Sequence, residues 1–147
     1  MGHPVSLHEP EIRTNDIDVY TDASDSGYGI VVVVQGKYLQ RAGTWTSLGT
    51  DDRPWNMPSW LPHINQRELA AVQLAEKFMA DLQIPCHHAR LHVDNTTALG
   101  VLRRGRSKSY WLNYLLTMQD NNWRSRDYVC TTDNLADKPS RGVWLDE

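Results

Sequence analysis

The stretch IDVYTDASDSGYGIVVVVQGKYLQRAGTW, residues 17–45, carries the first layer of the fold. Polar and apolar residues alternate over residues 17–22, which is the pattern of a β-strand with one buried face. The β-branched, apolar run over residues 28–34 predicts a strand inside a sheet. The turn at residues 35–37 then leads into a third strand over residues 38–45. Together these segments predict an antiparallel meander of three strands.

A long helix is expected next, over residues 65–83. One face of this helix carries apolar residues at helical spacing, namely Val72, Ala75, Met79 and Leu82. Glu68 lies on the same stripe. An isolated buried charge is costly, so a carboxylate aligned with the core requires a metal ion or another partner.

The remaining chain predicts a strand over residues 89–94 and a helix over residues 95–104, closed by Gly105. A further helix follows over residues 110–121. A short strand over residues 128–132 and a helical turn that begins at Asp137 complete the chain. The order is βββαβαα(β)α, which is typical of an α/β domain.

This order predicts where two aspartates meet. A right-handed crossover through the helix over residues 65–83 places the strand over residues 89–94 parallel to the first strand. Asp22 and Asp94 would then stand at the C-terminal ends of neighbouring parallel strands. Open α/β sheets place their sites at these ends.

Length and composition set the class of protein. A chain of 147 residues is of single-domain length. We expect an N-terminal arm over residues 1–15 and one domain over residues 16–147. The longest apolar run, residues 30–34, is too short to cross a membrane, and no secretory signal is recognisable. Two cysteines, Cys86 and Cys130, are too few for a disulfide framework, so we expect an intracellular protein with reduced thiols.

The charge of the whole chain does not indicate nucleic-acid binding, but one short segment is strongly basic. The net charge is −3, which does not by itself predict nucleic-acid binding. A basic stripe nevertheless falls within six residues, and such a stripe can bind phosphates while carboxylates elsewhere hold metals. It consists of Arg103, Arg104, Arg106 and Lys108. The competing interpretation is a solvated helix end whose cations complement the helix dipole.

Four carboxylates are the candidate catalytic residues: Asp22, Glu68, Asp94 and Asp137. The first and third come from strand ends, Glu68 from the crossover helix, and Asp137 from the start of the last helix. Magnesium prefers oxygen ligands. Two such ions about 4 Å apart can clamp an in-line phosphoryl displacement. The four acids therefore predict a metal-dependent nuclease.

The motifs around these acids resemble those of the ribonuclease H family over roughly residues 16–142. The segment 22–29, DASDSGYG, is similar to its first-strand motif, and NQRELAA, residues 65–71, to its helix motif. VDNTTA, residues 93–98, is similar to its second aspartate motif. NLADKPSR, residues 134–141, resembles the ending of ribonuclease H domains in retroelement reverse transcriptases of the LTR or tyrosine-recombinase type.

The resemblance implies a five-stranded mixed sheet with helices on both faces. It implies an endonuclease that hydrolyses the RNA strand of RNA–DNA hybrids with two Mg²⁺ ions, for which Mn²⁺ could substitute, and with no small-molecule cofactor. Asp22 would contact both ions, Glu68 and Asp94 would complete one site, and Asp137 the other. An attached polymerase domain would be a partner, and no membrane would be involved. Asp133 is a competitor for the place of Asp137, and the histidine that many members carry before this acid is missing.

Substrate contacts are expected from three places. The first is the turn that contains Ser24 and Gly27, where glycine leaves room for close approach. The second is formed by Asn65 and Asn95, beside two of the acids. The third is the basic stripe.

Two other functions remain open on the same fold. An integrase or transposase core would also use clustered acids and two metals. A non-catalytic hybrid-binding domain is the other, although such a domain usually loses its carboxylates. A zinc site at Cys86-His87-His88 lacks the usual ligand spacing.

Overall fold

The computed structural model describes residues 16–47, 64–117 and 122–146. Five strands form one sheet in the order β3-β2-β1-β4-β5. Their bounds are Ile17–Ala23 (β1), Gly27–Val34 (β2), Lys37–Thr44 (β3), Ala89–Val93 (β4) and Ser125–Tyr128 (β5). The helices are Ile64–Asp81 (α2), Thr96–Arg104 (α3), Tyr110–Thr117 (α4) and Asp137–Ser140 (α5). The predicted five-stranded α/β fold is confirmed.

The sheet is mixed, as predicted. β1 pairs antiparallel with β2, and β2 pairs antiparallel with β3, so the meander is present. β4 pairs parallel with β1, with Val19 beside Leu91, and β5 pairs parallel with β4. Asp22 lies near the end of β1, and Asp94 directly follows β4. The parallel pairing therefore brings both aspartates to one edge of the sheet.

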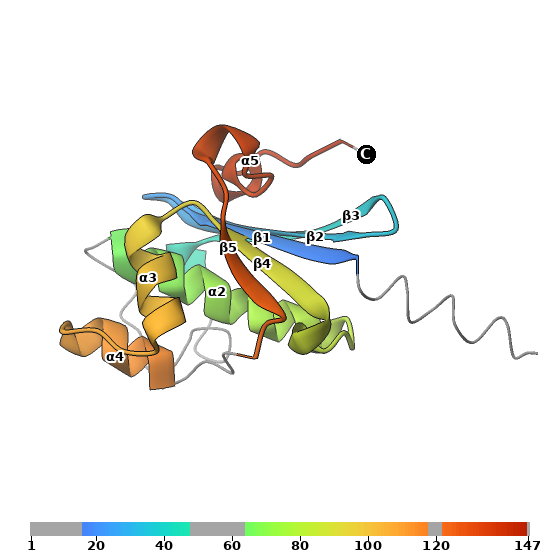
Figure 1. Cartoon of the computed structure of the whole chain (residues 1–147). Helices are drawn as coiled ribbons and strands as arrows, with labels where there is room; N and C mark the ends of the chain where they lie inside the picture. The colour runs from blue at the N-terminus through green and yellow to red at the C-terminus, as the bar shows by residue number, and fades with distance from the viewer. Residues whose placement is uncertain (1–15, 48–63, 118–121, 147) are drawn as a thin grey trace, which may run out of the picture.

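The helices cover the sheet unequally. α2, α3 and α4 lie on one face, and α5 lies alone on the other (Figure 1). The predicted apolar stripe of α2 faces the core, where Val72, Ala75 and Met79 are fully buried. Glu68 is buried on the same helix. The helix that crosses between β3 and β4 thus carries an acid into the interior.

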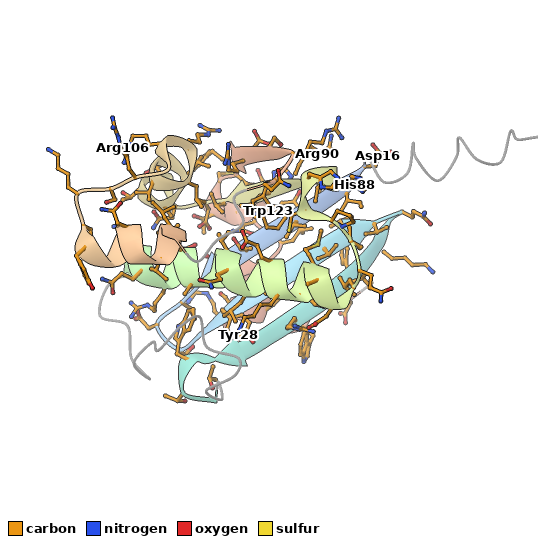
Figure 2. All side chains as sticks on the ribbon, turned by 90° about the horizontal axis from the view of Figure 1, so that it is seen from below. Asp16, Tyr28, His88, Arg90, Arg106 and Trp123 are labelled. Carbon is orange, nitrogen blue, oxygen red and sulfur yellow. The ribbon has the colours of Figure 1, made fainter. Side chains whose placement is uncertain are left out.

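Two tryptophans close the core at its margins. Trp45, which follows β3, and Trp123, which precedes β5, are both buried. The indole Nε1 of Trp123, labelled in Figure 2, donates to Glu76 Oε2 of α2 at 3.3 Å. None of the helices described is long and apolar enough to span a bilayer.

The predicted position of the fifth strand was wrong. We expected it over residues 128–132, but the chain pairs with β4 over Ser125–Tyr128. Residues Thr131–Asp133 form a 3₁₀ turn instead. β5 is an edge strand of mixed polar residues, so it lacks the apolar alternation that marks a half-buried strand. The predicted arm (residues 1–15), the segment with Trp55 and Trp60, and the end of the helix after residue 117 lie outside the described residues.

Candidate active site

Three of the four predicted acids converge at the C-terminal edge of β1 and β4. Asp22, Glu68 and Asp94 each offer a carboxylate oxygen, and these oxygens lie within 4.8 Å of one another. They reach this place from β1, from the second turn of α2 and from the residue after β4. The site therefore depends on the parallel pairing and on the crossover helix together.

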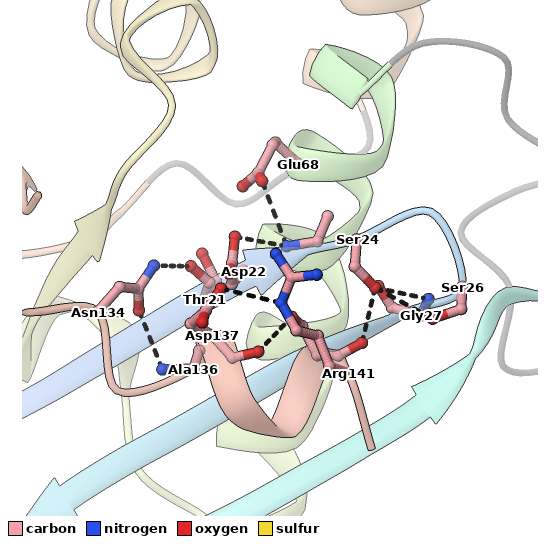
Figure 3. Close-up of polar contacts among 12 residues, drawn as sticks. Thr21, Asp22, Ser24, Ser26, Gly27, Glu68, Asn134, Ala136, Asp137 and Arg141 are labelled. Atoms are coloured by element: carbon pink, nitrogen blue, oxygen red, sulfur yellow. Dashed lines mark hydrogen bonds and ion pairs between the residues drawn. The ribbon is translucent and has the colours of Figure 1, made fainter. Parts of the chain in front are cut away.

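A backbone amide ties two of these acids to each other. The N–H of Ala23 donates to Asp22 Oδ1 at 2.9 Å and to Glu68 Oε1 at 3.2 Å (Figure 3). Glu68 is only 3% exposed, and its Oε2 is buried with no hydrogen-bond partner in the structure. A buried oxygen without a donor is unfavourable unless something fills its lone pairs. A cation between Glu68 and its acidic neighbours would do so.

Burial and mutual repulsion shift the acids toward the protonated form. Burial, followed by the charge of Asp94, raises the pKa of Asp22 to about 7. Burial, followed by the charges of Asp22 and Asp94, raises the pKa of Glu68 to about 10. The three carboxylates therefore repel one another when ionised, and a counter-charge is needed to stabilise them. A divalent metal ion would supply this charge.

Asp137 lies on α5, which covers the other face of the sheet from α2, the helix that carries Glu68. A side-chain hydrogen bond with Asp137 contributes to the raised pKa of Asp22. Its Oδ1 also lies 3.4 Å from Arg141 Nε, and the Asp137 side chain is 32% exposed. Asp137 thus contacts the site but stands outside the tight group of three acids. Asp133, the competitor, is exposed on the 3₁₀ turn and accepts from Cys130 Sγ at 3.0 Å.

Asn134 holds the segment that carries Asp137 against the sheet. Its Nδ2 donates to the Thr21 carbonyl at 3.0 Å, and its Oδ1 accepts from the N–H of Ala136 at 3.0 Å. Asn134 is 5% exposed, so these bonds are shielded from water. Our selection of site residues from the sequence left out Asn134, although it opens the motif at residues 134–141. The sequence feature that could have identified Asn134 is its place three residues before Asp137 in this motif.

The turn between β1 and β2, from which we expect substrate contacts, is held by its own serine side chain. Ser24 is buried, and its hydroxyl donates to the Ser140 carbonyl at 2.7 Å and accepts from the N–H of Gly27 at 3.1 Å. A Cβ on Gly27 would lie 2.2 Å from the Gly43 carbonyl oxygen. The glycine is therefore required by the packing of β3. Asp25 and Ser26 form the exposed part of the turn.

The two asparagines bond to each other beside the acids. Asn95 Nδ2 donates to Asn65 Oδ1 at 3.0 Å, and Asn95 Oδ1 caps α3 by accepting from the N–H of Ala98 at 2.8 Å. Asn65 precedes Glu68 by one turn of α2, and Asn95 follows Asp94. This pair therefore links the ends of α2 and α3 across the site.

The basic stripe lies at the end of α3 and in the connection to α4. Arg103 donates from Nε and Nη2 to the Arg126 carbonyl at 3.0 and 2.7 Å, which ties α3 to β5. Arg104, Arg106 and Lys108 are exposed. Figure 2 shows Arg106 at the end of the molecule opposite Arg90. In the part of the chain that the structure describes, neither Cys86 nor Cys130 forms a disulfide, and the group of side chains that could hold a metal does not include Cys86.

Comparison with known proteins agrees with this geometry at the level of the fold. No protein-family model and no curated protein matches the sequence. Among solved structures, the chain is similar to RNase H1 from the halophilic archaeon Halobacterium salinarum NRC-1, with a TM-score of 0.61 and 17% sequence identity. The match covers 86% of this chain and 98% of that one. The chain described here therefore has the ribonuclease H fold.

Proposed function

We propose that this protein is an endonuclease that cuts the RNA strand of RNA–DNA hybrids with the help of two divalent metal ions. The observation that carries the proposal is the group of Asp22, Glu68 and Asp94 at the C-terminal edge of β1 and β4. The fold, which resembles that of an RNase H1, supports the choice of substrate.

The donor set fits hard cations. Its members are carboxylate oxygens, which Mg²⁺ and Mn²⁺ accept, and the buried Glu68 Oε2 has no other partner. Asp22 would hold both ions, Glu68 and Asp94 would complete one site, and Asp137 the other. When bound, the ions would activate a water molecule and stabilise the leaving oxygen.

The protein itself contributes orientation. The Ala23 amide fixes the carboxylates of Asp22 and Glu68 relative to each other. Asn134 fixes the backbone that leads to Asp137. Groups that hold ligand side chains in place are worth about 10- to 100-fold in metal affinity or activity. We assign Asn65 and Asn95, the exposed Ser26, and the basic stripe to contact with the hybrid.

We also propose a retroelement origin for the domain. The segment NLADKPSR, residues 134–141, supports this origin through its resemblance to reverse-transcriptase ribonuclease H domains. An attached polymerase would then help to hold the hybrid.

The test is cleavage of one labelled RNA strand presented in three forms: annealed to DNA, annealed to RNA, and single-stranded. Each form is incubated with Mg²⁺, with Mn²⁺ and with chelator. Metal-dependent cutting of the hybrid alone is the expected result. In a parallel reaction with a labelled DNA duplex, cutting or joining of the DNA without cleavage of the hybrid would favour an integrase-type enzyme. An intact hybrid, with binding preserved, would indicate a non-catalytic domain or one that needs its polymerase.

A further inference from the structure

A groove lies beside α5. It has a volume of about 210 Å³ and runs between the end of the β2–β3 pair and the chain around α5. Its lining includes Ser26, Gly27, Gly43, Thr44, Arg141 and Trp144. Drug-sized ligands occupy pockets of about 300–1,000 Å³, so this groove suits a smaller group such as one base.

The most distinctive lining residue is an exposed tryptophan. Trp144 is 59% exposed, whereas Trp45 and Trp123 are 4% and 6% exposed. The backbone on both sides of Trp144 is anchored. Val143 N–H donates to the Lys138 carbonyl at 3.0 Å.

The second anchor is a pair of hydrogen bonds between a side chain and the backbone. The Leu145 N–H donates to Gln40 Oε1 at 2.8 Å, and Gln40 Nε2 donates to the Leu145 carbonyl at 3.0 Å. These bonds fix the backbone on both sides of Trp144, from which the exposed indole projects. A backbone that is fixed before binding need not be ordered by the ligand, which lowers the entropic cost of binding.

A cation connects the groove to the acids. The Arg141 side chain is 64% exposed and lines the groove, while its Nε lies 3.4 Å from Asp137 Oδ1. Figure 3 shows Arg141 between Asp137 and the turn that holds Ser24 and Ser26. The groove therefore begins one side chain away from the proposed site of cleavage.

We propose that this groove binds one unpaired nucleotide of a strand that continues past the hybrid, with the base on Trp144 and the phosphate at Arg141. An aromatic ring stacks on any base, and a guanidinium binds phosphate oxygens. A paired base is already stacked within its duplex, so an unpaired one is the natural ligand. This inference rests on the proposed function for the identity of the ligand. It makes the junction of hybrid and single strand a preferred substrate.

The first experiment measures binding without catalysis. A short single-stranded oligonucleotide, made once as RNA and once as DNA, carries a fluorescent label, and anisotropy is recorded in chelator. Trp144→Ala should weaken binding about 5- to 20-fold, as expected for the loss of one stacked base, and Trp144→Phe should retain most of it. Val143→Ala is the matched control, because Val143 is 54% exposed beside Trp144 but does not line the groove. Equal binding by wild type and Trp144→Ala would overturn the inference.

The second experiment compares cleavage of a blunt hybrid with cleavage of the same hybrid carrying an RNA or a DNA overhang. Wild type and Val143→Ala should cleave one of the overhang substrates faster than the blunt hybrid. The ratio of these two cleavage rates should fall toward one in Trp144→Ala. A ratio unchanged by Trp144→Ala, with cleavage intact, would reject the groove and keep the proposed function. No cleavage of any substrate, with the binding loss still present, would reject the proposed function and keep the groove.

Discussion

At the scale of single residues, the site is a group of carboxylates that the fold holds close together. Asp22 and Glu68 share one amide donor, and Glu68 keeps an oxygen with no donor in the structure. This arrangement is unfavourable for a metal-free protein and favourable for a metal-bound one. Two predictions follow from this opposition.

The first prediction concerns the loss of one acid. Asp94→Asn should lower hybrid cleavage by at least about 1,000-fold, because the metal contributes several kcal/mol to the transition state and each 1.36 kcal/mol is tenfold in rate. Hybrid binding should persist, because the basic stripe is untouched. Gel-based cleavage and anisotropy measure the two effects. Asp146→Asn, at an exposed aspartate, is the control. Cleavage by Asp94→Asn at the wild-type rate would remove Asp94 from the site.

The second prediction concerns pH. The folded pKa of Asp22, about 7, exceeds its ordinary value of 3.8, so the folded state binds the proton more tightly than the unfolded state. The resulting stability is fully present below about pH 4 and is lost as the pH rises through about 7. The raised pKa of Glu68 acts in the same direction. In chelator, the free energy of unfolding should therefore fall between pH 4 and pH 8.

Urea unfolding of wild type and Asp22→Asn at several pH values tests this effect. The variant lacks the titrating group, so its stability should fall less across the same window, by a difference on the order of a few kcal/mol. Asp18, whose partners are Arg90 and His92, acts alike on both proteins and cancels in the comparison. The pKa of Glu68 is raised in part by the charge of Asp22, so the difference between the two proteins reports on both acids. Parallel pH profiles would show that Asp22 does not titrate as described.

At the scale of elements, the site depends on how α5 sits on the sheet. Asn134 bonds to Thr21 of β1, and Ser24 bonds to Ser140 of α5. A Cβ on Gly29 would lie 2.5 Å from the Ser140 nitrogen and 2.7 Å from the Ala136 oxygen. The short last helix is thus held directly against the backbone of β2, and glycine is required there.

Gly29→Ala should therefore displace α5, lower stability by about 1–3 kcal/mol and reduce cleavage, because Asp137 moves with the helix. Gly100→Ala is the control. Its Cβ would meet only the mobile end of the Arg104 side chain, and alanine favours helix. Thermal unfolding and cleavage report on both variants. A Gly29→Ala protein with unchanged stability would show that β2 and α5 can separate at no cost.

The elements also show what the sequence could and could not predict. The convergence of Asp22, Glu68 and Asp94 could be predicted because topology rules place strand ends and a crossover helix together. β5 was misplaced because an edge strand has no apolar period. The inward orientation of Ser24 and the bond between Gln40 and Leu145 join residues far apart in sequence, so no local pattern announces them. The roles of these three acids and of Asp137, and the substrate contacts, stay predictions.

At the scale of the whole molecule, metal should act as a structural ligand as well as a catalytic one. A ligand that binds only the folded state at about 100 times its Kd adds about 2.7 kcal/mol. For a chain of this size, Mg²⁺ or Mn²⁺ should therefore raise Tm by roughly 5–10 °C. Differential scanning fluorimetry measures the shift, and Ca²⁺ serves as a comparison ion. No shift with any divalent ion would argue against a metal site.

The bond between Asn134 and the Thr21 carbonyl spans 113 residues. Every strand of the sheet lies between these two residues or includes one of them, so β1 to β5 can all be synthesised before this bond forms. A nascent chain therefore has Asp22, Glu68 and Asp94 long before it has Asp137. An unfinished or truncated chain lacks the last acid, so under the proposed function it would lack one of the metal ligands.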